Sequence, residues 1–187
     1  MAYAITTPTG KRTERKMLIT IAAWTEGSTP KACILGTRTE DSSIELNPDI
    51  ETTTDILGIN YTDINKTQPQ QTFDPAYVLG GDELMAYMNE ALLKNDINAY
   101  NGAFDIYVVA AYYSETTGTG SSAATAYRTV KHAGCSIIPQ SIGGDSFVSM
   151  PFDVYFSNNI TMGSVSGIDR TTLLAIATNF TADTPAA

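Results

Sequence analysis

The densest group of carboxylates lies in IELNPDIETTTDILG, residues 44–58, which contains Glu45, Asp49, Glu51 and Asp55. Clustered carboxylates can hold a metal ion, carry out acid/base chemistry, or keep one face of a strand in water. An EF-hand loop needs alternating acidic residues, a glycine at its sixth position and a glutamate at its twelfth. DIETTTDILGIN lacks that pattern. We therefore interpret these side chains as the solvent face of a strand.

Groups that could act as nucleophile or base are few. The only histidine is His132, and the two cysteines, Cys33 and Cys135, show no metal-ligand spacing, so we expect two buried reduced thiols. The sequence holds no phosphate-binding loop, dinucleotide fingerprint, HExxH or CxxC. Sequence order alone leaves a Ser-His-Asp or Cys-His arrangement open, although a lone histidine is more often structural. The sequence predicts no catalytic, cofactor or metal site, hence a protein that is not an enzyme.

Composition favours a β-rich protein with one domain spanning residues 1–187, because 43% of residues are hydrophobic, 17% are charged and 26 are threonine. The net charge of −9 repels phosphate backbones, which disfavours a conventional nucleic-acid binder. KRTERK, residues 11–16, is the one basic cluster and fits a solvated or interface segment. No apolar run approaches the ~20 residues of a membrane span, so we expect no membrane partner.

The elements that must position these residues are mainly strands. MLITIAAWT (17–25) and KACILGTRT (31–39) are rich in β-forming residues, and EGSTP between them predicts a hairpin. Pro48 cannot donate to a sheet ladder, so residues 44–58 are predicted to form a bent strand pair.

Residues 60–79, NYTDINKTQPQQTFDPAYVL, contain two prolines and little apolar periodicity, which predicts a long loop. Structureless loops beyond roughly 12 to 15 residues are uncommon unless they are functional. Its apolar side chains would be costly to leave in water, so we expect them to dock on a neighbouring subunit. These candidate interface residues are Phe73, Tyr77, Val78 and Leu79.

Residues 82–95 give the strongest helix signal, with Asp82 as N-cap and Lys94 in the last turn. An apolar stripe predicts packing onto a sheet; its members are Leu84, Met85, Met88, Ala91 and Leu92. Glu90 and Lys94 are spaced for an exposed ion pair.

The second half returns to strands. Period-two alternation predicts them at 104–113 and 145–157, which places Asp105 and Asp153 opposite apolar core positions. AYRTVKHAGCSII, NITMGSVSG and RTTLLAIAT are expected to complete the sheet. Residues 1–16 are expected to form an N-terminal arm and residues 179–187 a C-terminal tail. The fold class expected is mainly β, a β-sandwich or barrel with one flanking α-helix and a long assembly loop.

Three segments in this order resemble the phage tail tube (major tail) proteins: IELNPDIETTTDILG, then NKTQPQQTFDPAYVLGGDELMAYMNEALL, then FDIYVVAAYY. In that family a strand ending in a TDILG-like segment precedes a long loop with a TQPQQTFDP-like core. A Gly-Gly-Asp start to a single helix and further strands follow. The resemblance is best from Ile44 to Tyr113.

The resemblance implies a structural subunit of a phage tail, assembled in the bacterial host cytoplasm, whose hexameric rings stack into a tube. The tube lumen would conduct double-stranded DNA during genome ejection, and a tape measure protein and tail-end proteins would be its partners. The lumen is then expected to be net negative, with Asp105 and Asp153 as candidate lumen-facing residues. No cofactor is implied.

Three alternatives stay open. The same type of tube occurs in contractile injection systems and tailocins. A small β-sandwich carbohydrate-binding module would use exposed aromatic residues, which Tyr107, Tyr112, Tyr113 and Tyr127 could supply. A hydrolase would use paired carboxylates, which twenty acidic residues could provide by accident.

Overall fold

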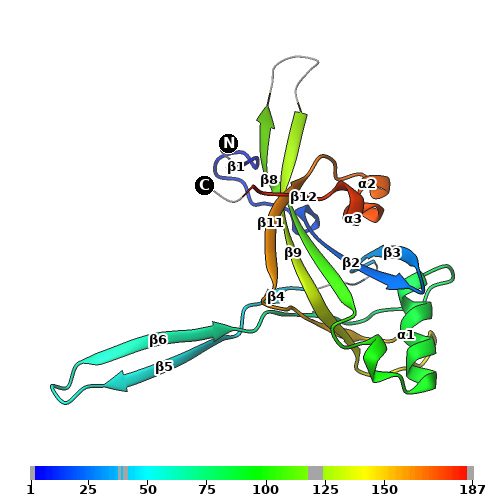
Figure 1. Cartoon of the computed structure of the whole chain (residues 1–187), viewed down its shortest axis with the longest axis horizontal. Coiled ribbons are helices and arrows are strands. Elements are labelled where there is room, and N and C mark those ends of the chain that lie inside the picture. The colour runs from blue at the N-terminus through cyan, green and yellow to red at the C-terminus, as the bar shows by residue number, and fades with distance from the viewer. Residues whose placement is uncertain (1–2, 38, 40–41, 118–123, 185–187) are drawn as a thin grey trace.

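Two long antiparallel strands, β8 and β9, form the centre of the fold (Figure 1). The computed structural model describes residues 3–37, 39, 42–117 and 124–184. In chain order the elements are β1 (Ala4–Ile5), η1 (Arg15–Met17), β2 (Leu18–Glu26), β3 (Thr29–Ile34), β4 (Ile44–Glu45), β5 (Pro48–Thr54), β6 (Asn60–Thr67), β7 (Gln70–Phe73), α1 (Glu83–Lys94), η2 (Ile97–Ala99), β8 (Phe104–Thr117), β9 (Ala124–Pro139), β10 (Phe152–Tyr155), β11 (Ile160–Val165), α2 (Arg170–Leu174), α3 (Ile176–Asn179) and β12 (Thr181–Ala182).

Ten strands form one antiparallel sheet in the order β3-β2-β8-β9-β10-β7-β4, with β1 added to β8, β11 added to β9 and β12 added to β11. The expected mainly β fold with a flanking helix is therefore confirmed. The sheet curves until its two flanks meet, since the Thr20 hydroxyl of β2 donates to Gln71 Oε1 of β7 at 2.9 Å. The Gln71 amide then donates to Ser42 Oγ at 3.0 Å. Gln71 is fully buried, so these bonds satisfy a polar group that would otherwise be costly to bury.

The larger core lies inside this curve. It combines apolar side chains from both flanks of the sheet with the buried face of α1, and its largest members include Trp24, Phe73, Leu84, Met88, Phe104, Ile106, Ile137 and Phe152. Phe73 and Phe152 stack with ring centroids 4.9 Å apart.

A second core covers the opposite face of β8, where Tyr107 and Val109 meet the C-terminal helices. The Phe180 ring packs edge-on against Tyr107, with centroids 5.4 Å apart. RTTLLAIAT forms α2 and α3 rather than the strand we predicted, because Asp169 caps α2 by accepting from Thr172 N–H at 3.0 Å. The tail predicted at 179–187 is likewise built into the domain through Phe180 and β12, and residues 185–187 lie outside the described part.

The N-terminal segment also contacts its own sheet. β1 pairs with Tyr113 and Ser114 of β8, and the Tyr3 ring lies 5.5 Å from that of Tyr113. The first described residues of the predicted N-terminal segment, 1–16, therefore pack against β8 of the same chain.

Helix α1 begins and ends where the sequence predicts. Asp82 accepts from Met85 N–H at 3.1 Å, and Asn95 ends the helix in the left-handed conformation. Lys94 and Glu90 form the expected exposed ion pair at 2.6 Å. Leu84, Met85, Met88 and Ala91 are buried as predicted. Leu92 is 37% exposed, so its predicted place in the buried stripe is wrong.

Two strand predictions need correction. The loop predicted at 60–79 contains β6 and β7, and β6 is the true partner of β5. The strand predicted at 145–157 is reduced to β10, because Pro151 lacks the N–H that a ladder needs and the chain before it pairs only in isolated bridges through Ser149. The hairpin of β2 and β3 is confirmed, with Gly27 in its turn at φ +63°.

Replacing Leu84 with alanine should destabilise the isolated subunit by about 2 to 5 kcal/mol, because the side chain is 1% exposed and its loss leaves a cavity. Leu93→Ala is the matched control, since Leu93 is 79% exposed and should change the unfolding free energy only slightly. Denaturant unfolding of both variants measures the difference. Equal effects would contradict the packing of α1 onto the sheet.

Gly163→Ala should also destabilise the subunit, by about 1 to 3 kcal/mol, because the added Cβ would lie 2.3 Å from the Thr181 oxygen and 2.6 Å from the Phe180 ring. Gly80→Ala is its control, as a Cβ there meets nothing within 4 Å. Thermal unfolding compares the two. A neutral Gly163→Ala would show that β12 and Phe180 are not held against β11.

Candidate assembly surface

Strands β5 and β6 form a hairpin, here called the arm, that projects away from the rest of the molecule (Figure 1). Their ladder runs from Pro48 opposite Thr67 to Thr54 opposite Asn60, with a bulge after Asp49. Every residue of β5 is exposed. An isolated two-stranded hairpin is marginally stable in water, so a covering layer would stabilise the arm.

The arm carries large apolar side chains that are exposed to solvent. Ile50 and Ile64 are directly opposite each other in the ladder and thus share a face. At the tip, Ile56 is fully exposed, Leu57 is 78% exposed and Ile59 is 49% exposed. Exposed apolar surface gathered in one place is typical of a protein–protein contact.

The tip is an ordered turn built around Asp55. Its Oδ1 accepts from the N–H groups of Leu57 at 2.8 Å and Ile59 at 2.9 Å, and its Oδ2 from the Tyr61 hydroxyl at 3.2 Å. Gly58 has φ +78°, which favours glycine. The hydrogen bonds from Ile59 and Leu57 lower the pKa of Asp55. This carboxylate therefore shapes the turn that presents the apolar tip.

Only part of the predicted interface is available to a neighbour. Phe73 is 1% exposed and packs in the subunit's own core, so its assignment to a subunit interface is wrong. Tyr77 and Val78 are exposed, and Leu79 is half-buried. Val78 and Leu79 lie with Ile142 and Val148 around a hollow of about 400 Å³ beside α1. The assignment of Tyr77, Val78 and Leu79 to an interface stays a prediction.

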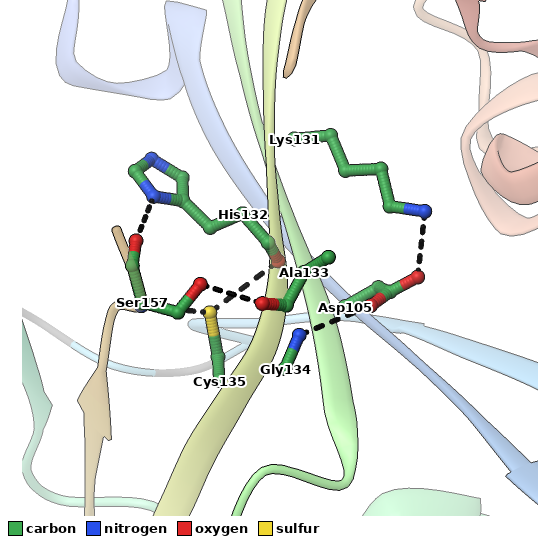
Figure 2. Close-up of polar contacts among 7 residues, drawn as sticks. All are labelled: Asp105, Lys131, His132, Ala133, Gly134, Cys135 and Ser157. Atoms are coloured by element: carbon green, nitrogen blue, oxygen red, sulfur yellow. Dashed lines mark hydrogen bonds and ion pairs between the residues drawn. The ribbon is translucent and has the colours of Figure 1, made fainter. Parts of the chain in front are cut away.

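The two candidate lumen residues, Asp105 and Asp153, differ in their exposure and in their partners. Asp153 is 9% exposed and accepts from the Thr72 hydroxyl at 2.6 Å and the Gln140 amide at 2.8 Å, so it offers little charge to a lumen and that assignment is corrected. Asp105 is partly exposed and pairs with Lys131 at 2.7 Å, as Figure 2 shows. This hydrogen-bonded carboxylate raises the pKa of Lys131. A lumen position for Asp105 stays a prediction, although its charge is offset by that pair.

His132 and Cys135 lie close together on β9, and both side chains contact main-chain groups, including those of Ser157 (Figure 2). The Cys135 thiol donates to the His132 main-chain oxygen at 3.4 Å, whereas His132 Nδ1 lies 2.9 Å from the Ser157 main-chain oxygen. Burial raises the pKa of the Cys135 thiol, and it raises that of Cys33 to about 12. Both cysteines are free thiols, as predicted, and Cys135 is buried. Cys33 is only half-buried, so the prediction of burial is wrong for that residue.

Within the described ranges, no group of three or more histidine, cysteine or acidic side chains is arranged to hold a metal ion. None of the helices formed by those residues is both long and apolar enough to cross a membrane.

Several solved structures are similar to this chain, among them the following two. One is the sheath-tube complex of PVC, an extracellular contractile injection system, in its extended state, with a TM-score of 0.43, 14% identity, and coverage of 84% of this chain and 95% of that chain. The other is the tube-terminating cap of the anti-feeding prophage, with a TM-score of 0.40, 13% identity, and coverage of 84% and 94% respectively. No protein-family model matches the sequence. A comparison with curated proteins finds no match.

Asp55→Ala should speed hydrogen exchange at the Leu57 and Ile59 amides under conditions that keep the protein monomeric, because these N–H groups lose their acceptor. Acidification should likewise lower the protection of these amides, measured relative to the slower intrinsic exchange at low pH. The lowered pKa of Asp55 means that its contribution is present above the ordinary aspartate value of 3.8 and is lost as the pH falls through the folded-state value. Asp49→Ala, elsewhere on the arm, is the control. Unchanged exchange in Asp55→Ala would show that the carboxylate does not hold the turn.

Proposed function

We propose that this chain is the structural subunit of a phage tail tube, forming stacked hexameric rings whose lumen conducts double-stranded DNA during genome ejection. The rings would be assembled in the bacterial host cytoplasm and carried in the virion with a tape measure protein and tail-end proteins. The observation that carries the proposal is the arm, whose apolar side chains are exposed in the isolated subunit. The order of sequence segments that resembles the tail tube proteins supports it.

A repeating assembly gives the arm a covering surface in every subunit. Burying Ile56, Leu57 and Ile59 would each contribute on the order of 1.5 to 3 kcal/mol, enough to offset much of the entropy of association. The two ends of the strand order, β3 and β4, are edge strands to which further chains could add. A ring closes such edges and is the usual result of a head-to-tail contact whose rotation closes.

The proposal includes the absence of catalysis. The main-chain contacts of His132 and Cys135 support it, because a nucleophile and its base need to face each other. The net charge of −9 supports a conduit through which DNA slides, since like charges avoid the counterion-releasing contacts that would hold the duplex.

The structure supports the two alternative functions to different degrees. A tube of a contractile injection system or tailocin would need the same subunit, so the arm supports it equally. A carbohydrate-binding module is less well supported, because Tyr107 is 2% exposed and Tyr127 packs against the second core. Stacking a sugar needs an open aromatic face.

Removing the arm should abolish assembly and leave the subunit folded. Pro48 and Thr67 face each other across the ladder, so an Asn-Gly turn can join them in place of residues 49–66. Among the residues that the structure describes, neither core cluster contains a residue of β5 or β6, so the melting temperature should change little. Electron microscopy and solution mass are the measurements, and we expect tubes from the full chain and monomers from the variant.

Leu93→Ser is the matched control, because it removes an apolar side chain that is 79% exposed outside the arm. It should assemble normally. A full chain that stays monomeric at high concentration would overturn the proposed function, whereas tubes from the armless variant would show that the arm is not the assembly element.

A further inference from the structure

The basic segment at residues 11–16 has no role in the features described so far. Four of the 11 lysines and arginines lie within these six residues, and with Glu14 the segment has a net charge of +3. All six residues are exposed. Arg15 fixes the segment to the body, because its guanidinium donates to the main-chain oxygens of Ser42 at 2.9 Å and Leu18 at 2.6 Å. The positive charge therefore has a defined place on the surface.

A groove of about 310 Å³ runs beside this segment. Arg15 and Lys16 form part of its rim, and its apolar lining includes Leu18, Ile19 and Leu35. It is also lined by Gly36 and by the polar residues Thr20, Thr39, Ser42 and Gln71. The groove thus combines a partly apolar lining with a cationic rim.

The arm has the complementary properties. Residues 48–67 contain Asp49, Glu51, Asp55 and Asp63 against Lys66, a net charge of −3. The same hairpin exposes the apolar pair Ile50 and Ile64 and the apolar tip. A hairpin with exposed apolar side chains and a net charge of −3 complements a partly apolar groove beside a segment of net charge +3.

We propose that the groove and the basic segment 11–16 form the docking site for the acidic arm of a second copy of this chain. This docking site specifies one contact of the proposed self-assembly, and the inference rests on that proposed function. The arm of the same copy projects away from the body (Figure 1). The proposed contact is between molecules. Each copy offers one arm and one groove, so the contact can propagate from subunit to subunit.

The apolar part of the groove favours the arm over a nucleic acid. A duplex and a second copy both approach a molecule of net charge −9, but the arm brings exposed apolar side chains together with a local net charge of −3. Exposed charges act over a Debye length of roughly 8 to 10 Å at physiological salt. Charge attraction would therefore align the arm with the rim before the apolar side chains meet, and assembly should weaken as salt is raised.

Reciprocal charge reversal tests the docking site. In one full-length variant Lys11 and Arg12 are both replaced by glutamate, and in the other Asp49 and Glu51 are both replaced by lysine. Each variant alone juxtaposes like charges and should raise the concentration needed for assembly by roughly tenfold or more. An equimolar mixture restores opposite charges at every contact, so it should assemble within about threefold of the unmodified chain, as coupled substitutions do. Sedimentation and electron microscopy are the measurements.

The matched control replaces Lys94 and Arg170 with glutamate. It makes the same change in net charge as the Lys11 and Arg12 variant, at exposed positions that do not line the groove. This control should assemble normally. Circular dichroism checks that each variant is folded. If the unmodified chain assembles and both variants also assemble alone, or if the mixture stays as defective as its parts, the docking site is wrong and the proposed function stands. A segment that binds a DNA duplex in the unmodified chain and loses it on reversal, without a change in assembly, would also overturn it. An unmodified chain that never assembles overturns both proposals.

Discussion

The burial of both faces of β8 is the constraint on which the rest of this structure depends. Ile106 points into the larger core while its neighbour Tyr107 points into the second, so successive residues of one strand serve two apolar clusters. A strand buried on both sides needs partners on both edges and cover on both faces. β2 and β9 occupy its edges, and α1 with the curled flank of β7 and β10 lies on one face. The C-terminal helices and Phe180 cover the other.

This arrangement leaves the arm outside the stabilised part of the chain. The body is closed by polar bonds between its flanks and by two apolar clusters that contain no residue of β5 or β6, so we expect the subunit to fold without the arm. The tip of the arm is nevertheless ordered, because Asp55 accepts hydrogen bonds from two amides and a hydroxyl there. Local order without burial is expected where a surface must be ready for a partner before that partner arrives.

The sequence predicts best where one residue has a local physical role. Asp82 and Lys94 mark the two ends of α1, and Gly27 marks a hairpin turn, because caps and turns depend on near neighbours. The arm was missed in part because residues 60–67 have little apolar periodicity, so the alternating pattern that predicts a half-buried strand is absent. Phe73 was misplaced for a different reason. Its burial against Phe152 depends on contact between segments far apart in the chain.

The C-terminal region shows how tertiary context overrides a strand-like composition. Residues 171–178 are rich in threonine and aliphatic residues, yet they are helical, and the local signal was the Asp169 cap with Thr172 three positions on. For the candidate assembly surface, the sequence predicted contacts through a loop at residues 60–79, whereas the exposed apolar side chains of the structure lie largely on the strand pair at residues 48–67. An exposed apolar strand pair would be a hazard for uncontrolled association. Threonines and carboxylates along the arm reduce that hazard, since they keep the strands wet and repel other arms of the same charge. A surface that repels its own kind and carries an apolar tip is suited to a different, positively charged surface, which is the relationship that a head-to-tail assembly requires.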